Sequence, residues 1–221
     1  MAEHVDHHAH HTHGLAHQFD DMAQQKESVL LGMWSFLITE VLFFGGYFAT
    51  YLVYRTHYPI AFAEGSHELD ITLGTFNTAV LILSSLTMAM AVHESHKGKK
   101  NGILFYLAAT LILGCVFLGV KYVEYSAKFE HGLVPGLAWH PHGEHSPQLA
   151  LYFSLYFGMT GMHAIHMIIG ACLIIWLMVK TARGTYTAEY NAPVEVFGLY
   201  WHFVDIVWIF LFPLLYLLGR H

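Results

Sequence analysis

A small set of ionisable side chains falls inside long apolar stretches of this sequence. Its members are Glu40, Lys121, Glu124, His163, His166, Glu195, His202 and Asp205. Burying an ionisable group away from water is costly, so residues of this kind are candidates for function by default. Carboxylates and imidazoles in such a setting can exchange protons, hydrogen-bond across helices or contact a lipid headgroup.

The spacing of these residues places several of them on shared helical faces. His163 and His166 are related as i and i+3 and share one face. A longer stripe of about 15 Å is formed at positions i, i+3, i+7 and i+10 by Glu195, Gly198, His202 and Asp205. The stripe stops near the middle of its apolar stretch, so we do not expect a continuous pore.

Glu40, the two histidines and the end of the stripe fall at similar depths in their stretches. We therefore expect one buried hydrogen-bonded layer with a role in proton transfer. The alternative is that these residues only hold helices together, since each interhelical polar contact in a membrane is worth about 1 kcal/mol or less.

Metal binding is not favoured by these residues. A bis-histidine haem would require His163 or His166 to face His202 from another helix. A di-iron bundle site requires Glu-x-x-His motifs on two helices, and none occurs within the apolar stretches. We predict no catalytic residue, no metal ligand and no cofactor in this chain.

The composition indicates a membrane protein. The 221 residues include 10 Lys+Arg and 16 Asp+Glu, or 12% charged, while 55% are hydrophobic. In soluble domains roughly a quarter of all residues are charged, and disordered chains are far less apolar than this one. With soluble and disordered classes excluded, the composition indicates an integral membrane protein. We expect no nucleic-acid partner.

Five stretches are long enough to cross a bilayer, which takes about 20 apolar residues. They cover residues 28–54, 71–93, 101–124, 148–180 and 193–219. Barrel strands would be shorter and would alternate strictly, so we predict an all-α integral membrane bundle of five transmembrane helices. Pro213 is expected to bend the last helix. Residues 1–27 form a polar, histidine-rich tail that we expect to be flexible, followed by the membrane domain 28–221.

The basic residues predict the orientation, because cytoplasmic loops are enriched in Lys and Arg. The N-terminal side collects Lys26, Lys97, Lys99, Lys100, Lys180 and Arg183. The opposite side collects Arg55, Lys128 and Arg220. We therefore predict an N-terminus inside and a C-terminus outside.

Four segments, in order, resemble the cytochrome c oxidase subunit 3 family of haem–copper terminal oxidases. The strongest is the run 197–212, which is similar to the family's terminal-helix signature. The runs 161–170, 32–44 and 121–125 resemble its preceding helix, its glutamate-bearing helix and a further family segment. Longer members have seven spans, so this chain resembles the short five-helix bacterial type, which lacks two N-terminal helices that form one wall of a lipid cleft.

The resemblance implies roles for individual residues. Glu40 matches a buried glutamate beside the lipid-filled cleft, and His166 matches a histidine that lines it. Lys180 and Arg183 match inner-side basic residues that hold phospholipid headgroups, which agrees with the predicted orientation. The terminal-helix residues that match the signature, Trp201, His202, Asp205 and Trp208, are expected to be structural.

The resemblance implies a non-catalytic subunit III of a proton-pumping oxidase in the bacterial inner membrane. Oxidase subunits I and II would be its partners and would carry the haems and copper. The chain would be part of an enzyme through that complex, stabilising the catalytic subunit, binding phospholipid and supporting proton uptake from the cytoplasmic side. Cytochrome c would be met only through the complex.

Two alternatives remain. The first is the equivalent subunit of a ubiquinol oxidase, although Glu40 favours the cytochrome c type because quinol relatives tend to have Asp there. The second is an independent proton transporter, which should show broken helices or internal symmetry; neither is evident in the sequence.

Overall fold

The computed structural model describes residues 17–139, 145–186 and 190–219, and these fold as a bundle of long helices. Residues 1–16 of the predicted tail lie outside the described residues. Five helices are long and apolar enough to cross a membrane, as predicted. They are α1 (Met22–His57), α3 (Ile71–His96), α4 (Lys100–Glu130), α5 (Ser146–Ala182) and α6 (Ala192–Phe212), the last continued by η1 (Pro213–Leu217).

Four of the five membrane helices are longer than the apolar stretches from which they were predicted. α1 begins at Met22, inside the segment assigned to the tail, because Asp21 caps it by accepting a hydrogen bond from Gln24 N at 2.7 Å. α3 begins in the same way, with the Asp70 side chain accepting from Thr72 N at 2.7 Å. Gly98, with a φ of 65°, turns the chain from α3 into α4.

The bundle has two ends, which we name by the course of α1. The proximal end is where α1 begins, and there α3 and α5 finish while α4 and α6 start. The distal end carries two elements that the sequence did not predict. They are the short helix α2 (Pro59–His67) and a hairpin of β1 (Leu133–Val134) and β2 (Ala138–Trp139).

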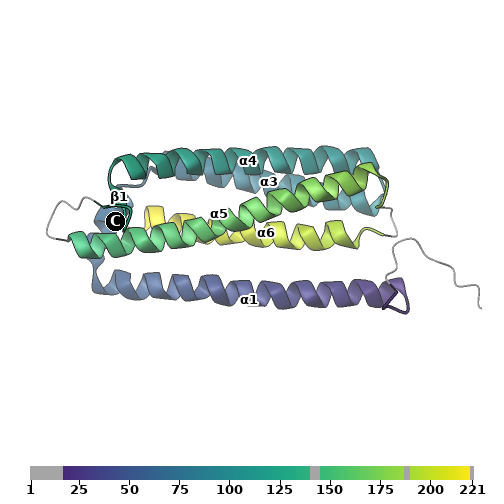
Figure 1. Cartoon of the computed structure of the whole chain (residues 1–221), viewed down its shortest axis with the longest axis horizontal. Coiled ribbons are helices and arrows are strands. Elements are labelled where there is room, and N and C mark those ends of the chain that lie inside the picture. The colour runs from purple at the N-terminus through teal and green to yellow at the C-terminus, as the bar shows by residue number, and fades with distance from the viewer. Residues whose placement is uncertain (1–16, 140–144, 187–189, 220–221) are drawn as a thin grey trace, which may run out of the picture.

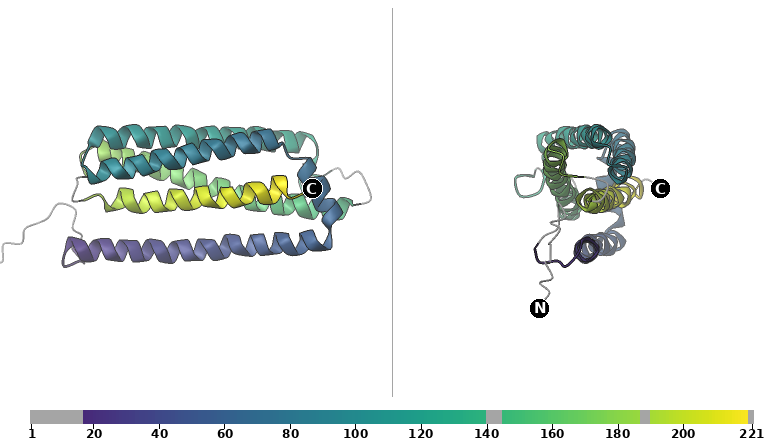
Figure 2. Two further views of the ribbon diagram at one scale, coloured as in Figure 1. Left: turned by 180° about the vertical axis from the view of Figure 1, so that it is seen from behind. Right: turned by 90° about the vertical axis from the view of Figure 1, so that its right-hand side faces the viewer.

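Four of the long helices form the compact part of the molecule. α3 packs on α4, α4 on α5, α5 on α6 and α6 back on α3, whereas α1 runs along one edge beside α5 and α6 (Figures 1 and 2). The core is aromatic, with Trp201, Trp208 and Tyr156 fully buried. Gly170 permits this packing, because a Cβ there would lie 2.7 Å from the Trp201 ring.

The last membrane helix changes from an α-helix to a π-helical turn at Pro213, the residue at which a bend was expected. Proline has no N–H to donate to the preceding turn, and the chain continues as the π-helical turn η1. Leu218 N donates to Pro213 O at 3.1 Å to close this turn. The wider turn places Tyr216 inside the bundle, where it is fully buried.

Candidate functional site

Helix α1 is tied to α5, α6 and η1 by polar contacts at three levels. At the proximal end, Lys26 Nζ lies 2.8 Å from Glu195 of α6. Midway, Glu40 Oε2 lies 3.1 Å from His166 Nε2 of α5. At the distal end, Tyr51 donates to Leu214 O at 2.9 Å. The helix is otherwise largely exposed, so these contacts fix its position beside the bundle.

An apolar cleft of about 530 Å³ lies between α1 and the helices α5 and α6. Its volume falls within the range of small-molecule binding sites. Its lining is formed by Met33, Phe36, Glu40, His166, Ile169, Leu173, Trp176, Leu177, Pro193, Val196, Phe197 and Tyr200. Glu40 and His166 are the ionisable groups of a wall otherwise made of apolar and aromatic side chains, so this cleft is the candidate site.

The hydrogen bonds of His166 define how many protons the Glu40–His166 pair holds. Nδ1 lies 2.8 Å from Met162 O, and a carbonyl can only accept, so Nδ1 carries a hydrogen. Nε2 therefore has either a free lone pair or a second hydrogen. Its contact with Glu40 Oε2 requires one proton between the two atoms, on the carboxyl in one form and on the imidazole in the other. In both forms the pair is neutral overall, which suits its place inside an apolar span.

The predicted lipid-binding cations lie at the proximal end of α5. Lys180 Nζ lies 5.7 Å from the ring centre of Trp176, a residue of the cleft wall. Arg183 follows the last turn of α5 and is exposed. The cleft therefore has apolar walls with one polar pair, and two basic residues lie at the proximal end of the helix that forms one of these walls.

The stripe on α6 lies away from this cleft. Glu195, Gly198 and His202 line a cavity of about 270 Å³ against α3 and Leu30 of α1. His202 and Asp205 line an adjoining cavity of about 370 Å³ between α3 and α6. His202 Nδ1 is 2.7 Å from Ser85 Oγ of α3. The stripe is thus directed mainly toward α3.

His163 belongs to neither group. It is 1% exposed and packs between Phe117 and Trp208, with ring centres 5.3 and 5.2 Å away. Among the described residues, neither of its ring nitrogens has a hydrogen-bond partner. The expected single layer is therefore formed only in part: Glu40 bonds to His166, whereas His202 bonds to Ser85 and His163 lies in an aromatic pocket. Residues that share a depth on different helices need not share a face.

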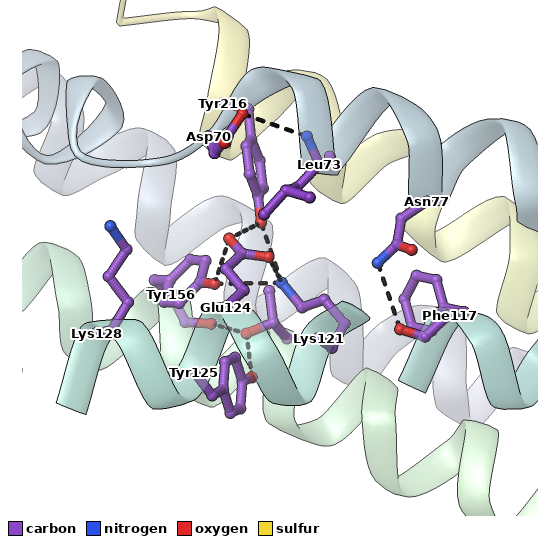
Figure 3. Close-up of polar contacts among 12 residues, drawn as sticks. Asp70, Leu73, Asn77, Phe117, Lys121, Glu124, Tyr125, Lys128, Tyr156 and Tyr216 are labelled. Atoms are coloured by element: carbon purple, nitrogen blue, oxygen red, sulfur yellow. Dashed lines mark hydrogen bonds and ion pairs between the residues drawn. The ribbon is translucent and has the colours of Figure 1, made fainter. Parts of the chain in front are cut away.

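The most extensively bonded polar group was only partly predicted (Figure 3). Lys121 Nζ of α4 donates to Glu124 Oε2 at 2.9 Å, Tyr156 Oη at 3.2 Å and Tyr216 Oη at 3.0 Å. Both tyrosines donate in turn to Glu124 Oε1, at 2.9 and 2.5 Å. The i, i+3 spacing of Lys121 and Glu124 inside an apolar span was the available signal, but their tyrosine partners come from α5 and η1 and could not be read from it.

The described residues contain no group of three or more His, Cys, Asp or Glu arranged to hold a metal ion. Glu40, Lys121, Glu124, His166 and His202 instead bond to one another, to backbone carbonyls or to hydroxyl groups of neighbouring helices. This arrangement can bind an amphipathic molecule and hold a proton.

Comparison with known proteins identifies the family. The sequence profile described as cytochrome c oxidase subunit III matches residues 11–132 and 140–220. The chain belongs to the cytochrome c oxidase subunit III family. The matched residues include all five membrane helices, the Glu40–His166 cleft and the Lys121–Glu124 cluster.

Relatives named as quinol oxidase subunits and relatives named as cytochrome c oxidase subunits have similar sequence identities to this chain. Subunit 3 of the cytochrome bo(3) ubiquinol oxidase of Pseudomonas aeruginosa is 30% identical over 207 residues, covering 94% of this chain and 93% of the relative. Cytochrome c oxidase subunit 3 of Thermostichus vulcanus is 33% identical over 208 residues, covering 94% and 96%. A probable quinol oxidase subunit 3 of Staphylococcus haemolyticus is 33% identical over 191 residues, covering 86% and 88%.

Proposed function

We propose that this chain is the non-catalytic subunit III of a proton-pumping terminal oxidase, in which it holds phospholipid beside the catalytic subunit. The observation that carries this proposal is the cleft between α1, α5 and α6, with Glu40 and His166 on its wall. Haems and copper would reside in subunits I and II. This chain would serve the reduction of O₂ to water by stabilising those partners.

The shape and chemistry of the cleft support a phospholipid as its occupant. The apolar side chains of the wall suit an acyl chain, which has no hydrogen-bonding groups to satisfy. Lys180 and Arg183 stand at the end of α5 where an anionic headgroup would lie. Glu40 and His166 form a neutral pair with each other, so an acyl chain can pass them without leaving a bare charge in contact with hydrocarbon.

The same pair supports a contribution to proton uptake. It holds one proton that can lie on Glu40 or on His166, and moving that proton between them does not change the total charge of the pair. The stripe of Glu195, His202 and Asp205 adds titratable groups from the proximal end to mid-bundle. With the proximal end on the cytoplasmic side, both features would take protons from the cytoplasm.

We assign the N-terminus to the inside and the C-terminus to the outside of the bacterial inner membrane. The support is the excess of Lys and Arg at the proximal end. Lys100 shows how these residues also serve the fold, because its Nζ donates to Ala182 O at the end of α5, at 2.6 Å. Accessibility of single cysteines at the exposed positions 97 and 130 to an impermeant thiol reagent in intact cells would test this: labelling of position 97 alone would reverse the assignment.

We further propose that cytochrome c, rather than a quinol, supplies electrons to the complex. The support is Glu40, at the position where quinol relatives tend to carry Asp. The test is to purify the complex through a tag on this chain and to compare its oxidation of reduced cytochrome c with its oxidation of ubiquinol. A dinuclear copper signal and cytochrome c oxidation would support the proposal, whereas quinol oxidation without that signal would replace it by the quinol type.

The same purification tests subunit membership itself. The expected result is co-elution with two larger haem- and copper-bearing subunits and cyanide-sensitive oxygen consumption. An independent proton transporter would instead purify alone and conduct protons in liposomes. Robust proton flux through the isolated chain, with no oxidase subunits recovered, would contradict the proposal.

A further inference from the structure

The two parts of α1 are packed differently against the rest of the bundle. From Phe44 to the distal end the helix is anchored: Phe44 is 2% exposed, and its ring centre lies 5.5 Å from that of His166. Tyr51 is fully buried and donates to Leu214 O of η1 at 2.9 Å. Arg55 donates to a backbone carbonyl just after η1. Buried rings and hydrogen bonds therefore hold this part of α1 in place.

The part of α1 that precedes Phe44, which we call the proximal arm (residues 22–43), is bordered by cavities instead. Met22 and Lys26 line a polar cavity of about 240 Å³ beside the ends of α3 and α6. Leu30 borders the cavity of about 270 Å³ against α3, and Met33 lines the lipid cleft of about 530 Å³. Side chains that border a cavity lack the dispersion contacts of a packed interface. The proximal arm is therefore free to move more than the rest of α1.

The contacts of the proximal arm can yield to a small displacement. The ion pair between Lys26 and Glu195 joins two long side chains that are 44% and 25% exposed. Phe36 faces the ring of Tyr200 with 6.1 Å between ring centres, and it is itself exposed. Contacts of this kind adjust by rotation of side chains, so they do not lock the arm.

Two adjacent glycines follow the proximal arm at the point where the anchored part begins. A Cβ at Gly45 or Gly46 would meet no neighbouring side chain or helix within 4 Å among the described residues, so packing within this chain does not require glycine there. Glycine weakens the middle of a helix relative to alanine, and kinks occur at such positions. Thr50 Oγ1 donates to Gly46 O at 2.8 Å, and a bond of this kind favours bending of a helix.

The length of the proximal arm converts a small bend into a useful movement. Met22 precedes Gly45 by 23 residues, or about 35 Å at 1.5 Å per residue. A bend of about 5° at the glycines would shift the start of the helix by about 3 Å, but Glu40 by less than about 1 Å. The Glu40–His166 contact can therefore persist while the wall of the cleft moves.

We propose that the proximal arm is a clamp that pivots at residues 44–46 and closes on the phospholipid acyl chain held in the cleft. The proposal rests on the proposed function, because that function supplies the occupant, and it adds how the site adapts to it. An acyl chain in the cleft gives Met33 and Phe36 the contacts that they lack without it, so it favours the closed position. Glu40 and His166 remain paired beside the pivot.

The test measures distances by double electron–electron resonance in the purified complex, with spin labels on unnatural amino acids in this chain. The proximal pair of labels occupies the exposed positions 28 and 97, and the distal pair occupies the exposed positions 56 and 130. Phospholipid is removed with detergent and then restored from phosphatidylglycerol and phosphatidylethanolamine. Restoration is expected to shift the 28–97 distance by about 2 Å and to narrow its distribution, while the 56–130 distance stays the same.

Substitutions locate the pivot and the occupant. Gly45→Ala/Gly46→Ala stiffens the helix at the pivot and is expected to reduce the 28–97 shift by about half or more. Gly32→Ala/Gly119→Ala is the matched control, because a Cβ at either position is equally free of neighbours within 4 Å among the described residues; it should retain the full shift. Leu173→Trp fills the cleft from its wall and should abolish the response to phospholipid.

The outcomes separate the clamp from the proposed function. Phospholipid that binds in the cleft without changing the 28–97 distance overturns the clamp and leaves the proposed function standing. Equal shifts in both pairs of labels, or a full shift in Gly45→Ala/Gly46→Ala, also overturn the clamp. Equal phospholipid content in wild type and Leu173→Trp counts against the proposed function, and against the clamp with it. The comparison of the two pairs of labels needs no change at the pivot, so it is decisive even if the glycine variant fails to assemble.

Discussion

The Lys121–Glu124 cluster and the Glu40–His166 pair are both ionisable groups within membrane helices, but their surroundings are opposite. The cluster is closed: Lys121 and Glu124 are 3% and 4% exposed, and two tyrosines complete their hydrogen bonds. The pair is open on one side, with the side chains of Glu40 and His166 18% and 11% exposed to the cleft. The first region joins three helical elements, and the second borders a space that a ligand can fill.

This difference gives a rule for interpreting ionisable residues in this bundle. A group whose donors and acceptors are all satisfied within the chain contributes to structure, and its removal should be felt in stability. A group that borders an open cleft, as Glu40 and His166 do, is available to something outside the chain.

Glu124→Ala should be the most destabilising change. It removes the counter-charge of Lys121 and leaves an ammonium buried among aromatic rings, with Trp208 centred 5.0 Å away. Breaking one side of a buried ion pair typically costs about 3–5 kcal/mol. Unfolding of the purified chain in detergent, followed by heat or by SDS titration, measures the loss.

The double variant Lys121→Met/Glu124→Leu provides the control for this prediction. It removes both charges together, so it should recover a large part of the stability lost in Glu124→Ala. Recovery should be incomplete because Tyr156 and Tyr216 lose their acceptor. If the single and double variants were equally unstable, the unpaired charge would not be the cause.

Tyr216→Phe should have an intermediate effect. The hydroxyl donates to Glu124 at 2.5 Å and accepts from Lys121 at 3.0 Å, so its removal leaves both charged groups one partner short. The cost expected for a buried polar group left unsatisfied is about 1–3 kcal/mol. Tyr106→Phe, a partly exposed tyrosine of α4, serves as the matched control and should change unfolding little; equal losses would place the effect outside the cluster.

Glu40→Ala should affect stability less and the function of the complex more. The change removes one interhelical contact, worth about 1 kcal/mol or less in a membrane, so assembly should be retained. Phospholipid retention, or the number of turnovers before inactivation, should fall. Complete loss of oxidase activity in a fully assembled variant would contradict a non-catalytic role.

Lys26→Ala should have the smallest effect. The Lys26 and Glu195 side chains are 44% and 25% exposed, and partly exposed ion pairs contribute about 0–1 kcal/mol. Unfolding should shift little, and the shift should diminish at high salt. A loss as large as that of Tyr216→Phe would show that the proximal tie of α1 is stronger than its exposure indicates.

The number, order and approximate extent of the membrane helices follow from the sequence because each depends on local apolar length. For Glu40 and His166, the sequence predicted that the two residues lie at similar depths in the membrane, but not that they form a pair. The rotation of each helix about its own axis could not be predicted, because sequence spacing defines the face of one helix but not which neighbour that face meets. His163 therefore lies in an aromatic pocket, and Asp205 lies on the side of α6 that faces α3. Helix α2, the β1–β2 hairpin and the inward Tyr216 depend on packing at the distal end, which no local pattern specifies.

The central claim is that the cleft between α1, α5 and α6 holds phospholipid, and native mass spectrometry of the purified complex tests it most directly. Leu173→Trp would fill the cleft from its wall, whereas Leu83→Trp on α3 adds the same bulk at an exposed position outside it. Wild type and Leu83→Trp are expected to retain the same bound phospholipid and Leu173→Trp to lose it, with subunit composition unchanged. Equal phospholipid content in all three complexes would contradict the account.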